Sequence, residues 1–398
     1  MTKIVDIEDI RKKREKKEIG IPIENINKKE LKRRGHEIGD ILGCDEKGEE
    51  ICVRKGKGNL YVDGDMEKEQ LFDFMRSQIY QNIQRGDSMV IVDLGSRIYK
   101  RELWIYLTIH GYRVDSYNMD CMTESDCFNC LDGLGAENEE QIVMIANDII
   151  DDQKYKFMTY PVETVCKALL SAVLLASLTE MEESDRNMLE IATIFRLGVS
   201  GTMLDKILHV MFEELDETSS AKQLFAMYSE AEEGIRMEAI QKIGNALAVY
   251  EKRANGSLCD NFRTNRYDME MPVKEKSVLF IESGQLPEDK VLFSVFMERL
   301  YDSMLKKAEE RQQDVTVMLL DYPYYGGLCG LEKYMEEGPE KGICTTLYED
   351  DRKLDGSGYA PHLVELYSLC DISVCIKDTE IPLCEIEKCE NPVTGECS

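Results

Sequence analysis

The chain has 398 residues, of which 43% are hydrophobic and 32% are charged, and these are the values of a globular protein rather than a disordered one. This length allows a large core and predicts two folding units. The formal net charge is −28, but residues 1–35 carry 12 Lys/Arg against 7 Asp/Glu, so the rest of the chain is still more acidic. An acidic body repels phosphate backbones and is therefore a poor DNA-binding surface by itself.

Residues 1–35 are predicted to form a charged arm. Its basic segment, Arg11–Lys17, allows two interpretations: a solvated helix end, or a contact with nucleic acid or anionic lipid. No apolar signal-peptide core follows Met1, so the 14 cysteines are expected to be reduced thiols in the cytosol. Residues 127–130 form one CxxC motif, and a zinc site would need two more ligands. The longest apolar run, residues 168–178, is shorter than the about 20 residues of a membrane span, so no span is expected.

The segment from residue 36 to residue 136 alternates strand and helix patterns. A short hairpin is expected first, over residues 38–42 and 50–54. Short runs rich in β-forming residues then alternate with stretches that have apolar residues at helical spacing, which predicts parallel βαβ units. The expected strands of the central sheet lie at residues 59–62, 89–93, 277–282, 315–321, 343–348 and 372–376. The sequence thus predicts an α/β fold with a mostly parallel sheet flanked by helices.

The pattern changes at residue 137, and from there almost every segment has helical periodicity. Residues 137–265 are therefore predicted to form an all-helical domain inserted between strands of the α/β domain. The α/β domain itself is expected to comprise residues 36–136 plus 266–380. An irregular tail is expected over residues 381–398.

One buried strand is predicted to carry a carboxylate to the edge of the sheet. Residues 315–320 are nearly all apolar, and Asp321 ends the run before a series of turn residues. Ligands of open α/β sheets bind at the carboxyl ends of the strands. In RecA-like ATPases an Asp at this position holds Mg²⁺ through water, and the next residue is usually a Glu that activates water. Here Tyr322 follows, and an ordinary tyrosine pKa of about 10 prevents it from acting as that base. The alternative interpretation is a core strand that ends in a solvated Asp.

The loop after the first expected strand occupies the position of a phosphate-binding loop. A working loop has the pattern GxxxxGK[ST], in which glycines let backbone N–H groups face the phosphates and the Lys neutralises them. Gly64 is the one glycine of residues 63–70, and Glu69 or Gln70 stands where the Lys is needed. One like-charge contact at about 4 Å and an effective dielectric constant of about 20 costs about 4 kcal/mol before screening. A rearranged loop that uses Lys68 is one alternative, and a helix N-terminus with acidic residues that suit its dipole is the other. The acidic residues of the loop are Asp63, Asp65, Glu67 and Glu69.

Several short motifs follow the order found in type IV secretion coupling proteins of the TraG/TraD type. Ser88–Asp93 resembles the family's "S-x-V-I-T-D", residues 110–114 resemble "G-Y-x-V", and residues 125–129 resemble "S-D-x-x-N". Residues 319–326 resemble the Walker B stretch "L-L-D-E-F-x-x-I-G". The resemblance covers about residues 36–378. It implies a RecA-like nucleotide-binding domain with an inserted all-helical domain, assembly into hexameric rings, and the delivery of DNA–relaxase substrates to a secretion channel.

The sequence departs from this family at the positions that carry its chemistry. No membrane anchor is expected, the phosphate loop lacks its Lys, and the Walker B Glu is replaced by Tyr322. The family's "D-P-K-G-E" keeps its first residue as Asp93, while the rest is Leu-Gly-Ser-Arg. Of the family's motif residues that carry its chemistry, this sequence keeps Asp93 and Asp321. The resemblance therefore implies the fold and a mobile-element context, and not ATPase activity.

These observations predict a catalytically degenerate (pseudo-ATPase) relative of the coupling proteins that acts as an accessory, adaptor or docking partner. Its implied partners are a coupling ATPase or a relaxase, and its implied place is the cytoplasm or the inner face of the membrane through those partners. No catalytic residue and no cofactor are expected. Gly64 and Lys68 would be relics of the phosphate loop, and Asp321 a relic of the metal site. Two alternatives stay open: an active coupling protein that uses ATP and Mg²⁺ at an atypical site, or a scaffold unrelated to secretion.

Overall fold

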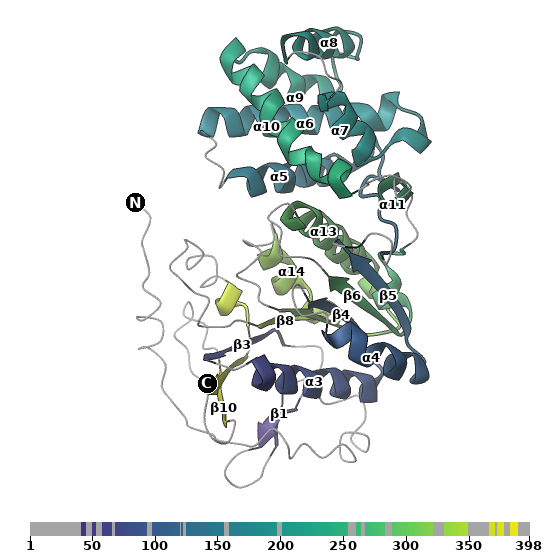
Figure 1. The fold of residues 1–398 in the computed structure, drawn as a ribbon, viewed down its shortest axis with the longest axis vertical. Helices are drawn as coiled ribbons and strands as arrows, with labels where there is room; N and C mark the ends of the chain where they lie inside the picture. Colours follow the sequence, from purple (N-terminus) through teal and green to yellow (C-terminus); the bar gives the residue numbers. More distant parts are fainter. Residues whose placement is uncertain are drawn as a thin grey trace. The chain divides into compact units, whose positions relative to one another are not determined.

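The chain folds into two compact units, an α/β unit and a helical unit (Figure 1). The α/β unit contains Met1–Ser116, Met269–Glu282 and Leu300–Ser398, and the helical unit contains Tyr117–Asp268 and Ser283–Arg299. The expected arm, residues 1–35, lies outside the residues that the structure describes. The computed structural model describes residues 41–44, 50–52, 58–65, 68–93, 98–119, 121, 125–154, 159–196, 201–253, 260–263, 267–282, 289–320, 330–348, 366–370, 372–377 and 383–388.

The α/β unit is built on a sheet of eight strands in the order β10-β9-β3-β8-β7-β4-β6-β5. The neighbouring strands from β9 to β6 pair in parallel, as the expected crossover helices require. A separate antiparallel hairpin joins β1 and β2. The strand bounds are β1 Ile41–Cys44, β2 Glu50–Cys52, β3 Leu60–Asp65, β4 Ser88–Asp93, β5 Arg113–Asn118, β6 Ser277–Glu282, β7 Val315–Leu319, β8 Ile343–Tyr348, β9 Ile372–Lys377 and β10 Leu383–Lys388.

Helices cover both faces of this sheet. On one face α3 (Lys68–Arg85) and α4 (Ile98–Ile109) pack Ile79, Ile83 and Leu107 against the strands to form the main apolar core. On the other face α13 (Asp289–Lys307) places the Tyr301 hydroxyl 2.9 Å from Thr345 Oγ1 of β8. The ring of Tyr301 also stacks on Tyr334 of α14 (Leu331–Glu337). A sheet covered on both faces explains the nearly continuous apolar runs of its central strands. A short helix, α12 (Met271–Lys274), leads into β6.

The fold class and the six strands predicted from sequence are confirmed, with boundary shifts of a few residues. One prediction was wrong. Residues 381–398 were expected to be irregular, but Leu383–Lys388 form β10, which pairs antiparallel with β9. The segment was missed because two of its six residues are Glu, a residue that strands disfavour, although its apolar residues alternate with charged ones.

Asn59 ties the start of β3 to its surroundings. Its side chain is buried, and its Nδ2 donates to Met335 O at 2.6 Å and to Leu369 O at 3.1 Å. Its Oδ1 accepts from Thr345 N–H at 2.9 Å. This one amide therefore connects β3 with β8, with α14 and with the segment before β9, and it fixes the position of the strand that carries Gly64.

The helical unit consists of helices throughout the described residues from 136 to 263. Its central helix is α6 (Tyr160–Glu180), which packs against α5 (Glu139–Lys154), α9 (Ser220–Ser229) and α10 (Glu233–Arg253). The remaining helices are α7 (Met188–Arg196), α8 (Gly201–Glu213) and α11 (Asp260–Arg263). The sequence placed the start of this region at residue 137, whereas the compact unit starts at Tyr117. The ring of Tyr117 stacks on Phe296 at 4.0 Å between centroids, and Phe128 contacts both rings edge-on.

Helix α6 is long and apolar enough to cross a membrane by length and composition. Sequence reasoning counted the uninterrupted apolar run at 168–178 and missed that the whole helix passes this test. However, 78% of its most apolar window is buried inside the protein. A helix that is apolar all round and surrounded by other helices is typical of the core of a bundle.

A buried polar network holds three helices of the bundle together. Asp205 of α8 accepts hydrogen bonds from the Tyr228 hydroxyl at 2.7 Å and from Arg236 Nε at 3.0 Å. Tyr228 belongs to α9 and Arg236 to α10. His209 Nε2 lies 3.6 Å from the same carboxylate. Burial raises the pKa of Asp205, but the hydrogen bonds from Arg236 and Tyr228 outweigh it, so the net pKa is below the ordinary value.

Candidate functional site

The first candidate position is the junction between β3 and α3, where a phosphate loop was sought. Strand β3 ends at Asp65 and helix α3 begins at Lys68, so two residues separate them. Gly64 lies inside the strand, in register with Ile376 of β9. A phosphate cradle needs several consecutive residues outside regular structure, so that their N–H groups converge on one oxygen cluster. Of residues 63–70, all but residues 66 and 67 belong to β3 or α3.

Of the sequence-predicted site residues, the structure describes the backbone positions of Gly64 and Lys68. Lys68 is the first residue of α3, where the free N–H groups of a helix start do face outward. Nevertheless, the first turn carries Glu69, which opposes a bound anion. Asp321 follows β7 by two residues and lies outside the described part of the chain. Strand β8 lies between β3 and β7, which puts the ends of those two strands about 10 Å apart at the usual strand spacing.

A buried ion pair occupies the carboxyl edge of the sheet at the neighbouring strands. Glu282 ends β6, and its Oε2 lies 2.7 Å from Lys100 Nζ of α4. Ser116 Oγ of β5 lies 2.9 Å from the same Nζ and 3.2 Å from the same Oε2. Asp93 ends β4 directly beside Glu282 in the strand register, and it is buried as well. The side chain of Glu282 is 3% exposed and that of Lys100 is 18% exposed.

This cluster is built to hold α4 rather than to react. Lys100 Nζ, Ser116 Oγ and Glu282 Oε2 contact one another, and Ser116 and Glu282 are almost inaccessible to solvent. A nucleophile or a general base must reach a substrate atom within about 3 Å, which these buried atoms do not offer. The cluster therefore anchors the helix after β4 to the edge of the sheet at which ligands of such folds usually bind.

The described residues contain no group of three or more His, Cys, Asp or Glu side chains that could hold a metal ion. In the CxxC motif both thiols are buried, and burial raises the pKa of Cys130 to about 12. At the β3–α3 junction the structure describes strand up to Asp65 and helix from Lys68.

Sequence reasoning identified part of this edge and missed the rest. It named Asp93 as a residue that the resemblance retains, and the structure places it beside Glu282. It did not name Lys100, Ser116 or Glu282 as partners. The ending of an apolar strand on Glu282 was the available signal, because a carboxylate at the buried end of a strand needs a counter-charge.

The described geometry defines a RecA-like α/β unit joined to an inserted helical unit. No family model and no curated protein matches the sequence. Among solved structures, the chain is similar to the bacterial conjugative coupling protein TrwBΔN70 in its unbound form, with a TM-score of 0.59 and 15% identity over 90% of this chain and 77% of that one. The same protein in complex with sulphate has a TM-score of 0.58 and 15% identity, over 91% of this chain and 80% of that one. TrwB with the non-hydrolysable ATP analogue ADPNP has a TM-score of 0.56 and 14% identity, over 91% of this chain and 80% of that one. The expected resemblance to coupling proteins is confirmed at the level of the fold.

Proposed function

We propose that this chain is a catalytically degenerate relative of conjugative coupling proteins and acts as an accessory or adaptor protein of a type IV secretion or conjugation system. The observation that carries the proposal is the two-residue junction between β3 and α3. The fold is similar to that of TrwB, which has been solved with the non-hydrolysable ATP analogue ADPNP, and in this chain two residues separate β3 from α3.

The electrostatics of the junction support the same conclusion. Phosphate binding at a helix start requires converging N–H groups and a positive charge. Here acidic residues flank Lys68 on both sides, and Tyr322 stands where a water-activating Glu would act. Loss of the loop removes nucleotide affinity, and loss of the base removes hydrolysis, so the two defects are independent. Gly64 and Lys68 are then relics of a phosphate site, and Asp321 is a relic of a metal site.

Exposed apolar side chains of the α/β unit support a role in binding other proteins. Helix α4 presents Ile105 and Ile109, 72% and 75% exposed, and Trp104 beside them. Contiguous exposed apolar residues commonly mark protein–protein contacts. The partners that we propose are a coupling ATPase or a relaxase, and we expect the chain to lie in the cytoplasm or at the inner face of the membrane through them.

Isothermal titration with Mg-ATP and with Mg-ADP tests the proposal that the β3–α3 junction does not bind nucleotide. The expected Kd is no tighter than about 1 mM, which corresponds to about −4 kcal/mol. Glu69→Lys removes one repulsive charge and is expected to leave hydrolysis undetectable, because the base is missing as well. Micromolar binding of Mg-ATP would instead favour the alternative, an active coupling protein with an atypical site.

Co-purification from cells that carry a conjugation system tests the adaptor role. The full chain is expected to retain a coupling ATPase or relaxase, and the double variant Ile105→Glu/Ile109→Glu is expected to lose it. The two side chains are exposed, so this variant is expected to fold normally, which circular dichroism checks. Retention of the partners by the double variant would exclude α4 as the contact, and absence of both partners from the unmodified chain would contradict the adaptor role.

A further inference from the structure

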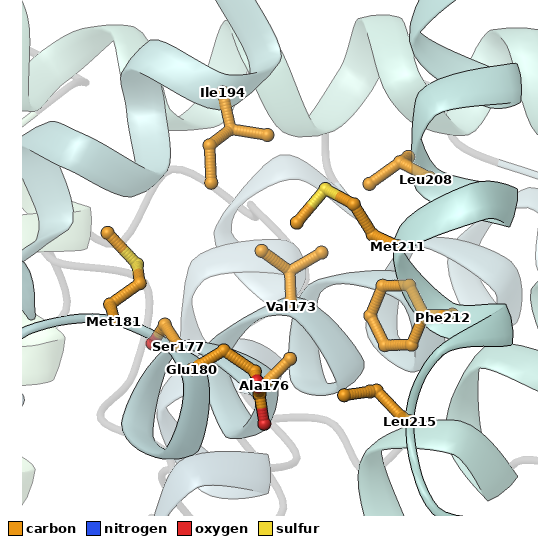
Figure 2. A pocket seen from close by; sticks show the side chains of 10 residues that line it. All are labelled: Val173, Ala176, Ser177, Glu180, Met181, Ile194, Leu208, Met211, Phe212 and Leu215. Carbon is orange, nitrogen blue, oxygen red and sulfur yellow. The ribbon is translucent and has the colours of Figure 1, made fainter.

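The helical unit has two hollows beside α7, and they differ greatly in size. The first lies between α6, α7 and α8, and Figure 2 shows Val173, Ile194 and Met211 pointing toward its centre. It holds about 50 Å³. An engineered cavity of roughly 150 Å³ binds benzene, so this first hollow is too small for a ligand. The second lies between α7, α8 and α10 and holds about 650 Å³, which is within the range of about 300–1,000 Å³ that is usual for ligand sites.

Helix α10 contributes the longest part of the lining of this second hollow, which we call the α10 groove. Along α10 the lining extends from Met237 to Glu251, which is about 21 Å at about 1.5 Å per residue. Gly244 and Ala248 belong to this lining, and their small size keeps the middle of the groove open. An extended chain rises about 3.3 Å per residue, so the α10 groove is long enough for about six extended residues.

Two side-chain amides of α10 have the spacing of an extended peptide. Gln241 and Asn245 line the α10 groove, both are exposed, and neither amide makes a hydrogen bond within the part of the chain that the structure describes. They are four residues apart, so they lie on the same side of the helix and about 6 Å apart along its axis. An extended chain repeats after two residues, about 6.6 Å. Each amide has one carbonyl acceptor and N–H donors, as a peptide unit does, so the pair can bind alternate peptide units.

The charges of the α10 groove favour a peptide over a nucleotide or a nucleic acid. Among its described lining residues Arg196 is the only cation, and its Nε lies 2.7 Å from Glu251 Oε1. This cation is therefore already neutralised, and the net charge of −28 opposes the approach of a phosphate group. At the other end of the lining, Met237 and Ile240 offer an apolar surface for a side chain. The groove thus combines amide partners with an apolar contact.

We propose that the α10 groove binds an extended peptide segment of a partner protein, whose backbone pairs with the amides of Gln241 and Asn245. Backbone hydrogen bonds supply affinity, and pockets for alternate side chains supply specificity, as in other proteins that bind extended peptides. Alternate side chains of an extended chain point to opposite sides, so one apolar side chain contacts Met237 and Ile240 while its neighbours point away. The inference rests on the adaptor role proposed above and adds a second contact to it, separate from α4.

Selection from a phage library of random peptides tests the proposal on the full chain. The displayed peptides have about eight residues, slightly more than the about six extended residues that the groove accommodates. The most enriched peptide is synthesised with a label, and fluorescence anisotropy measures its Kd. An analogue with methylated backbone nitrogens keeps every side chain but loses the N–H donors, so it is expected to bind at least about tenfold more weakly. Failure to enrich any peptide, or equal binding of the methylated analogue, would overturn the proposal.

Matched variants locate the binding site. The double variant Gln241→Ala/Asn245→Ala removes both amides, whereas Gln223→Ala removes an exposed amide of α9 that does not line the α10 groove. All three side chains are exposed, so both variants are expected to fold, which circular dichroism checks. The double variant is expected to bind the selected peptide at least about tenfold more weakly, and Gln223→Ala less than about twofold more weakly. Equal effects of the two variants would contradict the site.

Two further outcomes separate this inference from its alternatives. A dimer of the unmodified chain that the double variant dissociates would assign the α10 groove to a second copy and would overturn the proposal. The peptide measurements use the purified chain alone, so they do not require a coupling ATPase or a relaxase. A selected peptide that binds through Gln241 and Asn245 supports the groove even where co-purification contradicts the adaptor role, so the two proposals fail separately.

Discussion

The ion pair between Lys100 and Glu282 offers a sharp test of how α4 is held on the sheet. We expect Lys100→Met to keep the apolar stem of the side chain and to remove its charge. Glu282 is then left 3% exposed without its counter-charge. Removing one partner of a buried pair costs about 3–5 kcal/mol. The lower end, about 3 kcal/mol, applies here because Lys100 keeps 18% exposure and Ser116 still donates to the carboxylate.

Urea unfolding followed by tryptophan fluorescence measures this loss of stability in the α/β unit, to which the ion pair belongs. The chain has one tryptophan, Trp104, which lies on α4, and Lys100 Nζ is 5.9 Å from its ring centre. The matched control is the double variant Lys100→Met/Glu282→Gln, in which no charge is left unpaired. It is expected to be more stable than the single variant, by about 1–2 kcal/mol. A single variant that loses less than about 1 kcal/mol, or a double variant that loses the sum of both changes, would refute the buried-pair account.

Three further predictions concern a buried amide, a glycine with a positive φ and a buried carboxylate. Asn59→Ala leaves buried backbone groups of β8 and α14 without a partner and is expected to lower the free energy of unfolding by about 2–4 kcal/mol, measured by urea denaturation. Gly342 has a φ of +74°, so Gly342→Ala is expected to cost about 2 kcal/mol in the same assay, and an unchanged stability would show that the turn relaxes. Asp205 has a lowered pKa, so its contribution is present above the ordinary value of 3.8 and is lost as the pH falls through the lower folded-state pKa. Asp205→Asn is therefore expected to destabilise the helical unit at pH 7, and the difference from the unmodified chain should shrink below about pH 4, as measured by circular dichroism.

The sequence was informative about the fold where apolar runs are long and uninterrupted. Ser277–Glu282 and Val315–Leu319 are buried on both faces, so their composition alone indicated central strands. The edge strand β10 is different, because an edge strand tolerates charged residues and its composition resembles that of a loop. The start of the helical unit at Tyr117 was also beyond sequence reasoning, since it depends on the stacking of that ring with Phe296, far away in the chain.

The candidate site was less predictable than the fold. Gly64, Lys68 and Asp321 were proposed from motif positions and stay predictions, because Asp321 lies outside the described residues; the strand order places one strand, β8, between β3 and β7. The cluster of Lys100, Ser116 and Glu282 joins residues up to 182 positions apart in the sequence. No local pattern encodes such a contact, because it arises when β5 and β6 become neighbours in the sheet. Short motifs can be recognised in a sequence, whereas the partner of a buried charge depends on which strands become neighbours in the sheet.

The central claim is that the chain retains the RecA-like fold without its reaction. Phosphate release from Mg-ATP, measured side by side for the unmodified chain and for Asp321→Ala, tests that claim most directly. Under the proposed account Asp321 is the relic of a metal site, so any genuine turnover should require it. The account predicts that both proteins release phosphate at the background rate of buffer alone. Turnover by the unmodified chain that Asp321→Ala abolishes would contradict it.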